Sequence, residues 1–229
     1  MRRAGFTLVE LLVSTAILGA VLAVVLASTA ASGALQREER ARSSLEDALS
    51  LFATVFAREV YPTGYRVSAS GTALLALEVS DTGDALEGRY LCEAGMRHLC
   101  EGAGSVVQYA YRLKEGVVEW GDGSGYYPAL GGEFQVEAFR LAHRRGGSWE
   151  RSPLTLKVGD GERVQALALY VLASFPSKRS TAFTPGSAVT WPEGLSLDTF
   201  GVGGAPLEGA RVWAERLVVV PVPNLEVKP

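Results

Sequence analysis

The residues best suited to take part in a reaction or an ion pair stand at the start of the chain, in the hexapeptide Gly-Phe-Thr-Leu-Val-Glu that begins at Gly5. Its carboxylate, Glu10, is followed by an uncharged and largely apolar run from Leu11 to Leu35. About twenty apolar residues in a helix are enough to cross a bilayer, so this run predicts a membrane-spanning helix. A carboxylate at the centre of such a helix costs roughly 2.5–3.5 kcal/mol and usually has a partner. Glu10 is therefore expected either to reach back to the lipid headgroups or to pair with a cation.

The N-terminal pattern resembles a known processing signal. A short basic leader with Arg2 and Arg3, then Gly-Phe-Thr-Leu-x-Glu, then an uncharged helix, is similar to the class III signal of type IV pilins and of the pseudopilins of type II secretion. This resemblance implies that a membrane-embedded prepilin peptidase cleaves between Gly5 and Phe6 and methylates the new amine of Phe6. It covers residues 1–35 or so, and it makes other pilin or pseudopilin subunits the expected partners.

Cleavage at this point gives Glu10 a physical role. It leaves a cationic amine on Phe6, and neither this amine nor a carboxylate is tolerated unpaired in an apolar medium. Opposite charges about 4 Å apart attract far more strongly there than in water. Glu10 of one subunit is therefore expected to pair with Phe6 of its neighbour and to set the register of stacked helices during assembly.

An ordinary secretion signal is the alternative for the same segment, because the small residues from Ala27 to Ala31 imitate an A-x-A cleavage site. Against it, the apolar run from Leu8 to Leu26 is longer than the roughly 7–15 residues of such a signal, and Glu10 interrupts it. Both interpretations place the leader in the cytoplasm and the bulk of the chain outside it. We therefore expect a single-pass inner-membrane protein that later enters a pilus or pseudopilus.

The helix is predicted to continue beyond the apolar run as an amphipathic helix over residues 36–61. Apolar residues recur there at three- and four-residue steps and form one stripe, at Leu45, Ala48, Leu49, Phe52, Phe56 and Val60. Pro62 cannot continue the helical hydrogen bonds, so the helix should end beside it. The expected organisation is a leader over 1–5, a transmembrane or filament-core helix over 6–35, the amphipathic helix, and an extracytoplasmic β-rich domain over 62–229.

The remainder alternates β-type segments with turns. Strands are predicted over 65–70, 73–80, 106–114, 117–120, 133–144, 154–158, 164–175 and 211–220. Loops are predicted over 81–88, 121–132, 176–194 and 198–209. Lys114-Glu115-Gly116 is typical of a hairpin turn. Gly146-Gly147 is expected to turn a second hairpin, which returns through Trp149 into the strand that follows.

The fold class predicted from these elements is α+β. A long N-terminal helix packs on an antiparallel β-sheet domain, as the resemblance to pilins also implies. The segments 164–175 and 211–220 are nearly continuous apolar runs, so they are expected to form a central, covered sheet. About 165 residues are enough for one core, and one globular domain is expected there.

The two cysteines of the chain, Cys92 and Cys100, are close in sequence. Outside the cytoplasm, an even and closely spaced pair predicts a disulfide that closes a small loop. Such a loop contributes about 2–3 kcal/mol to stability. His98 lies between them, but three candidate ligands without a second pair do not favour zinc.

The sequence indicates neither an enzyme nor a cofactor. Its two histidines, His98 and His143, stand in no metalloprotease motif and beside no nucleophile motif. The glycine-rich segment 201–204 lacks the strand and helix that flank a phosphate-binding loop. The segments 121–125 and 159–161 are typical of turns and lack EF-hand spacing, with calcium as the open alternative.

A basic cluster surrounds the second predicted hairpin. The residues that offer charge or a ring to DNA are Arg140, Arg144, Arg145, Trp149 and Arg151. Such a tip could hold phosphates and stack a base, whereas the alternative is a solvated hairpin that protects a sheet edge. The net charge favours this alternative, because loss of the leader arginines leaves 20 basic residues (22 minus 2) against 25 acidic ones.

Three functions therefore compete. The leading hypothesis is a minor pilin-like subunit that primes or caps a type IV pilus, because the large domain with its long buried strands resembles the larger minor pilins and J-type pseudopilins. The mid-chain cysteines depart from the common pattern of major pilins. The second is a minor pseudopilin of a type II secretion system. The third is a membrane-anchored module that binds DNA or a surface.

Overall fold

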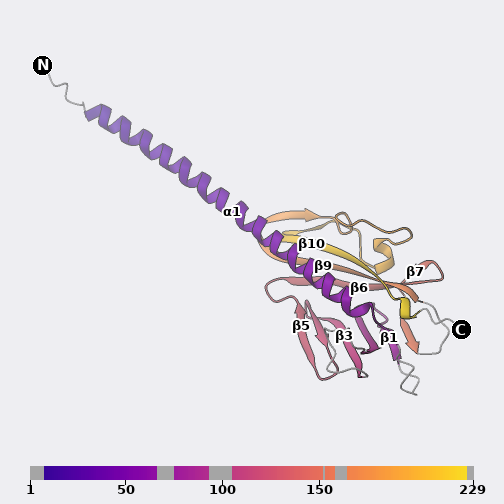
Figure 1. The fold of residues 1–229 in the computed structure, drawn as a ribbon. Coiled ribbons are helices and arrows are strands. Elements are labelled where there is room, and N and C mark those ends of the chain that lie inside the picture. Colours follow the sequence, from indigo (N-terminus) through magenta and orange to yellow (C-terminus); the bar gives the residue numbers. More distant parts are fainter. Residues whose placement is uncertain (1–7, 66–74, 93–104, 152, 158–163, 226–229) are drawn as a thin grey trace. The chain divides into compact units, whose positions relative to one another are not determined.

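The computed structural model describes most of the chain, over residues 8–65, 75–92, 105–151, 153–157 and 164–225. The chain divides into two compact units, Met1–Ala41 and Arg42–Pro229. Figure 1 shows the order of their helices and strands.

The N-terminal part of helix α1 (Leu8–Val60) carries the apolar run. It contains an 18-residue window with a mean hydropathy of 2.5, none of it buried, and by length and composition it is able to cross a membrane. The hydroxyls of Thr15 and Thr29 donate to carbonyls three and four residues earlier at 3.0 Å. These polar groups are therefore satisfied within the helix, as a lipid environment requires.

The C-terminal part of α1 packs its apolar stripe into the core of the second unit. The buried residues of the stripe are Leu45, Leu49, Phe52, Phe56 and Val60, and Ala48 is half-buried beside them. The ring of Phe52 meets Tyr111 edge-on at 5.8 Å and Phe139 at 6.4 Å between ring centroids. The predicted stripe is thus confirmed as a core face.

The described strands form two antiparallel sheets. In the order β5-β4-β3-β2-β1-β8, the first sheet has as its described strands β5 (Tyr126–Leu130), β4 (Val117–Gly121), β3 (Val106–Lys114), β2 (Ala85–Leu91), β1 (Leu75–Val79) and β8 (Leu154–Lys157). In the order β10-β9-β6-β7, the second has β10 (Leu207–Pro221), β9 (Val164–Phe183), β6 (Gln135–Arg145) and β7 (Ser148–Glu150). Among the described residues, the short 3-10 helices are η2 (Leu197–Phe200) and η3 (Pro223–Leu225). The predicted α+β class is confirmed.

Both predicted hairpin turns are confirmed. Glu115 and Gly116 join β3 to β4 with φ values of 51° and 78°. Gly146 and Gly147 join β6 to β7 with φ values of 57° and 93°. Two successive positive φ values match the right-handed twist of the strands that such a turn connects, and glycine adopts them without strain.

The predicted loops 81–88 and 121–132 contain strands, and both predictions were wrong for a physical reason. Strand β2 lies partly within 81–88, where Gly88 interrupts the apolar pattern; its missing side chain leaves the space that the ring of Tyr109 fills. Strand β5 lies within 121–132 and contains Pro128. Proline is tolerated there because β5 is an edge strand of the described sheet.

Three further strand predictions need correction. The segment 154–158 was predicted to continue the β6–β7 hairpin, but β8 pairs with β1 in the other sheet. The prediction failed because the short alternating pattern of this segment does not indicate which strand it pairs with. Strand β9 continues to Phe183, into the predicted loop 176–194, and pairs there with β10, which begins at Leu207, inside the predicted loop 198–209. Within the described part of the chain β10 lies at a sheet edge rather than centrally; its apolar run reflects contacts with both cores. The predicted strand 65–70 lies, apart from Tyr65, outside the described residues.

A second core covers the other face of β6 and β9. There Tyr170 stacks on Trp191 at 6.0 Å and lies 5.8 Å from Phe200, between ring centroids. The carboxylate of Glu215 accepts hydrogen bonds from the Tyr170 hydroxyl at 2.5 Å and from the backbone N–H of Gly186 at 2.6 Å. These contacts fix the segment after β9 on the sheet.

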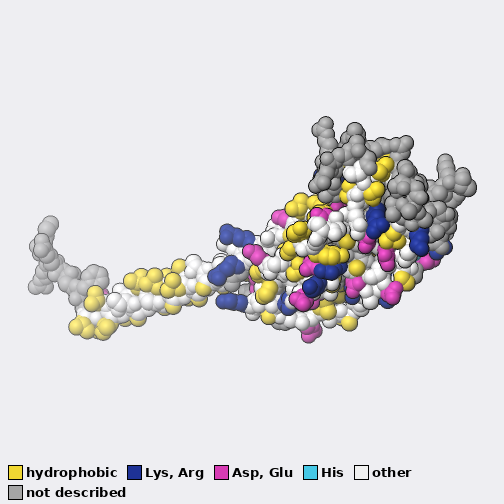
Figure 2. Space-filling view, turned by 90° about the horizontal axis from the view of Figure 1, so that it is seen from below, with side chains coloured by type: hydrophobic (Ala, Val, Ile, Leu, Met, Phe, Trp, Pro, Cys, Tyr) yellow, Lys and Arg dark blue, Asp and Glu magenta, His cyan; other side chains and the backbone are white. Residues whose placement is uncertain are grey.

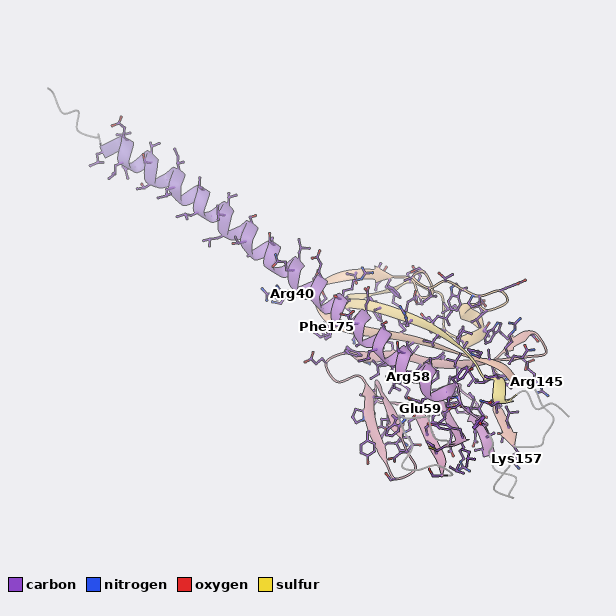
Figure 3. The ribbon with its side chains drawn as sticks, viewed as in Figure 1. Arg40, Arg58, Glu59, Arg145, Lys157 and Phe175 are labelled. Carbon is purple, nitrogen blue, oxygen red and sulfur yellow. The ribbon has the colours of Figure 1, made fainter. Side chains whose placement is uncertain are left out.

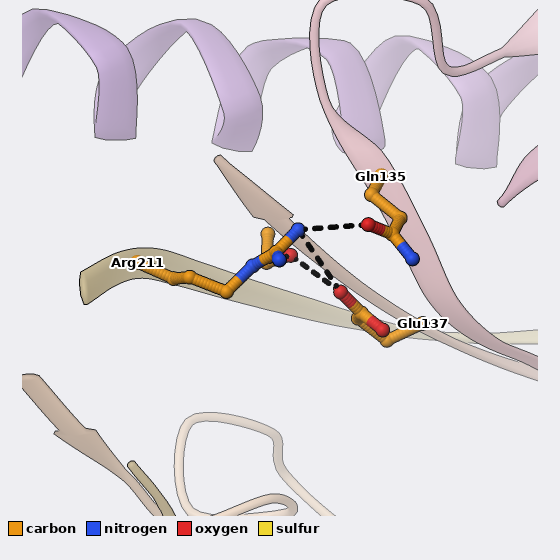
Figure 4. A network of polar contacts seen from close by, with 4 residues as sticks. Gln135, Glu137 and Arg211 are labelled. Atoms are coloured by element: carbon orange, nitrogen blue, oxygen red, sulfur yellow. Dashed lines mark hydrogen bonds and ion pairs between the residues drawn. The ribbon is translucent and has the colours of Figure 1, made fainter. Parts of the chain in front are cut away.

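A polar network joins three strands of the second sheet (Figure 4). On β10, the Arg211 guanidinium donates to the Ser174 hydroxyl on β9 at 2.8 Å and to the Gln135 side-chain carbonyl on β6 at 3.0 Å. It also lies 3.2 Å from the Glu137 carboxylate, which accepts from Ser174 at 2.7 Å. The network therefore satisfies polar groups at a buried position, since Ser174 has no exposed surface.

Candidate functional site

The predicted processing site lies at the very start of the chain. Gly5 and Phe6 lie outside the described residues, so the cleavage and the methylation remain predictions. Glu10 lies in the first turn of α1 with its side chain exposed. Its pairing with a neighbouring subunit also remains a prediction.

The N-terminal part of α1 is an exposed apolar surface (Figure 2). Its large side chains are open, among them Leu8 at 75%, Val24 at 69% and Leu26 at 66% exposed. Basic side chains follow this stretch, and the Arg37 guanidinium donates to the carbonyl of Gly33 at 3.2 Å. So large an apolar surface needs lipid or protein to cover it, which suits both a membrane anchor and a helix that packs with others.

The structure separates the proposed DNA-contacting residues into two groups. Arg144, Arg145 and Trp149 lie together on the β6–β7 hairpin, with both arginines exposed and the Arg144 guanidinium 6.0 Å from the centre of the Trp149 ring. By contrast, Arg140 donates to the carbonyl of Phe139 at 3.0 Å and Arg151 to a carbonyl of η2 at 3.3 Å. The Trp149 ring also packs against the second core, so only part of it is open to a base.

The remaining predicted sites lie partly outside the described residues. Cys92 is buried just after β2, but Cys100 lies outside them, so the disulfide stays a prediction. In the loop 121–125, Asp122 accepts hydrogen bonds from the backbone and hydroxyl of Ser124, and these bonds lower the pKa of its carboxyl. The loop 159–161 is not described. Among the described residues, no group of three or more His, Cys, Asp or Glu could hold a metal ion.

An apolar cleft that the sequence did not predict lies within the second unit, between the last turns of α1 and strands β3, β4 and β5. Its volume is about 970 Å³. The apolar residues of its wall include Phe52, Tyr111, Trp120, Tyr127 and Leu130. Its described lining includes two charged side chains, Arg58 and Glu59, both on the last turns of α1 (Figure 3).

Glu59 is a buried carboxylate in this cleft, with 4% of its surface exposed. One carboxylate oxygen accepts a hydrogen bond from the indole N–H of Trp120 at 2.8 Å, and the other accepts one from the hydroxyl of Tyr111. Burial raises the pKa of Glu59, although both hydrogen bonds act to lower it. Burial, together with the charge of the same carboxylate, raises the pKa of Tyr90 to about 12.

The apolar spacing in α1 is enough to predict that this carboxylate is buried. Glu59 stands three residues after Phe56 and seven after Phe52, which places it on the apolar face of the helix. A carboxylate at such a position must either be desolvated with partners or distort the packing. Its partners, Tyr111 and Trp120, come from strands far along the chain, and the sequence alone does not place them beside it.

Comparisons with known proteins address the family. A family model described as "Type IV pilin Tt1219" matches residues 44–225. The chain belongs to the Tt1219-like type IV pilin family. A second model, described as "Prokaryotic N-terminal methylation motif", matches residues 1–26 of this pilin. Among curated proteins, none matches it.

A solved structure supports the same assignment. The type IV-like pilin TTHA1219 from Thermus thermophilus is similar to this pilin with a TM-score of 0.69 and 42% sequence identity. The similarity covers 79% of this chain and 98% of that one. Pilins are structural filament subunits, and the motif together with the apolar helix indicates a membrane-anchored one.

Proposed function

We propose that this pilin is a minor pilin-like subunit of a type IV pilus that primes or caps filament assembly. One observation carries the proposal: a methylation motif over residues 1–26 coincides with a helix whose apolar N-terminal surface is exposed. Before assembly, such a subunit is anchored in the inner membrane, with its leader in the cytoplasm and its globular domain outside the cytoplasm. It then serves adhesion, twitching motility or DNA uptake through the filament.

The first step is processing of the precursor. Prepilin peptidase cleaves between Gly5 and Phe6 and methylates the amine of Phe6. Glu10 of one subunit then pairs with this amine on its neighbour, because a buried carboxylate and a buried amine stabilise each other in an apolar medium. The pair fixes the axial position at which a subunit enters the filament.

Intact mass and N-terminal sequencing of the protein from its native membrane test this step. The expected chain begins at N-methyl-Phe6, and a Gly5→Val variant, whose cleavage point is altered, is expected to stay uncut. A native chain that begins near Ala31 would instead identify a secretion signal. A native chain that is uncut would leave a simple membrane anchor.

The minor role is tested by counting subunits. Purified filaments are expected to contain far fewer copies of this chain than of their principal subunit. Its deletion should reduce the number of filaments and leave those that form intact. Equal abundance of the two subunits contradicts a minor role. Normal filaments together with a loss of protein secretion would assign the chain to a type II secretion pseudopilus.

DNA binding is a second candidate function, favoured by the exposed Arg144 and Arg145 on the β6–β7 hairpin. Each phosphate contact adds about 0.9 to the slope of log affinity against log salt. Changing both arginines to glutamine should therefore reduce that slope by up to about 2. Arg216→Gln, which changes an exposed arginine on β10, is the matched control. Affinity that depends on neither salt nor the hairpin would exclude this function.

A further inference from the structure

The cleft beside Glu59 is an apolar hollow that opens to water. Side chains at its rim are well exposed, with Leu51 at 68%, Val55 at 49% and Tyr127 at 51%. A packed protein surface seldom leaves so many large apolar side chains open around one hollow without a ligand or partner. Small-molecule sites in proteins have volumes of about 300–1,000 Å³, and the cleft, at about 970 Å³, is large enough for an organic ligand.

The carboxylate of Glu59 gives the cleft a chemical preference. Its two hydrogen-bond donors, the Tyr111 hydroxyl and the Trp120 indole, are both neutral. Among the described residues, no lysine, arginine or histidine forms an ion pair with it. A carboxylate offers about four acceptor positions, and two are used here. A ligand with a positive head would therefore meet an acceptor with which none of the described basic side chains forms an ion pair.

The aromatic walls add to this preference. The rings of Trp120 and Tyr127 lie 6.3 Å apart between centroids, and Tyr111 lies beside them in the lining. Tyr111 and Trp120 turn their hydrogen-bonding edges to Glu59, so their rings form an apolar wall beside the carboxylate. Such a wall suits the apolar body of a ligand, and Glu59 attracts a positive head.

We propose that this cleft binds a small alkylammonium ion, with the ammonium head at Glu59 and the apolar body against the aromatic walls. A neutral apolar ligand would desolvate the Glu59 carboxylate further without compensating its charge. An anionic ligand would be repelled by this carboxylate. The volume of the cleft favours a free small molecule over one lysine side chain of a partner.

Isothermal titration calorimetry on the full mature chain in nonionic detergent tests the proposal, with empty micelles as the blank. The probes are hexylammonium, hexan-1-ol and hexanoate, which share one apolar chain and differ in the charge of the head. Hexylammonium is expected to bind at one site at least about tenfold more tightly than hexan-1-ol. Hexanoate is expected to bind most weakly. Equal binding of the three probes, or no binding of hexylammonium, overturns the proposal.

The variants locate the site. Glu59→Gln keeps the size of the side chain and removes its charge. The affinity for hexylammonium should therefore fall to within about threefold of the affinity for hexan-1-ol, while the affinity for hexan-1-ol is unchanged. Glu46→Gln makes the same change at an exposed carboxylate of α1, and the preference should persist. Amine binding that survives Glu59→Gln overturns the assignment of Glu59. The probe series on the unmodified protein stands even if that variant does not fold, and its outcome is independent of prepilin processing.

Discussion

The ring of Phe56 on α1 lies 5.2 Å from the ring of Tyr111 on β3, between centroids, with the two planes inclined by 58°. Phe56 is completely buried, and Tyr111 in turn donates a hydrogen bond to Glu59 one turn along the same helix. One strand residue therefore holds α1 through both an aromatic contact and a polar one. The packing of the helix and the chemistry of the cleft depend on the same side chain.

The first prediction follows from this contact. Phe56→Ala should lower the free energy of unfolding by about 3–5 kcal/mol, because it removes a fully buried ring and leaves a cavity. Leu51→Ala is the control on the same helix; Leu51 is 68% exposed, and its loss should change stability by no more than about 0.5 kcal/mol. Urea denaturation followed by circular dichroism measures both. Equal effects of the two substitutions would show that this part of α1 does not pack as described.

The second prediction concerns pH. Burial raises the pKa of Glu59 above its ordinary value of 4.5. Between the two values the folded state binds more protons than the unfolded state, so the contribution of Glu59 to stability is lost as pH rises through that interval. Glu59→Gln does not titrate. Its stability relative to the unmodified protein should therefore improve from pH 4.5 toward neutrality.

Denaturation curves at a series of pH values measure this difference. The tyrosines around Glu59 do not contribute, because the pKa of Tyr90 is raised to about 12 and those of Tyr109 and Tyr111 are raised further by burial. Glu46→Gln, at an exposed carboxylate of α1, should not reproduce the trend. A Glu59→Gln difference that is flat or reversed with pH would mean that the carboxylate is not desolvated.

Local patterns in the sequence predicted the elements whose partners are close along the chain. The three- and four-residue spacing from Leu45 to Val60 identified the buried face of α1, since a helix repeats its faces at that interval. The turn at Glu115-Gly116 was equally predictable, because Lys114-Glu115-Gly116 is typical of a hairpin turn, and the structure shows a positive φ at both Glu115 and Gly116. Strand β2 was missed because the reason for a glycine at position 88 lies outside the local sequence. The ring of Tyr109, a neighbour in the sheet that is distant in sequence, occupies the space that a side chain at Gly88 would need.

The same reasoning separates the two candidate sites. The N-terminal motif is a continuous stretch, so the sequence alone predicts its role, from Gly5 to Glu10. The cleft is assembled from a helix and several strands, and its carboxylate is recognisable only when Tyr111 and Trp120 are placed around it. Burial of Glu59 was inferable from its place on the apolar stripe, whereas its ligand chemistry required the fold.

The third prediction tests the network on the second sheet. Arg211→Met should cost about 1–3 kcal/mol, because the buried hydroxyl of Ser174 and the carboxylate of Glu137 lose a donor. Arg42→Met is the control, since its ion pair with Glu46 is exposed on both sides and should contribute at most about 1 kcal/mol. Unfolding free energies measured at low and high salt compare the two. A larger loss for Arg42→Met would contradict the structure of the network.

The fourth prediction rests on the proposed assembly role of Glu10. Glu10→Ala should be cleaved and methylated normally, because the peptidase acts on the Gly5–Phe6 bond, yet it should enter filaments at least about tenfold less often. Removing one partner of a charge pair in an apolar medium costs about 3–5 kcal/mol, which is more than tenfold in an equilibrium constant. Quantitative mass spectrometry of sheared filaments and of membranes measures the two pools. Glu46→Ala removes an exposed carboxylate of the same helix and should assemble normally. If Glu10→Ala assembles as well as this control, the register is set by packing of the apolar helices and not by a charge pair.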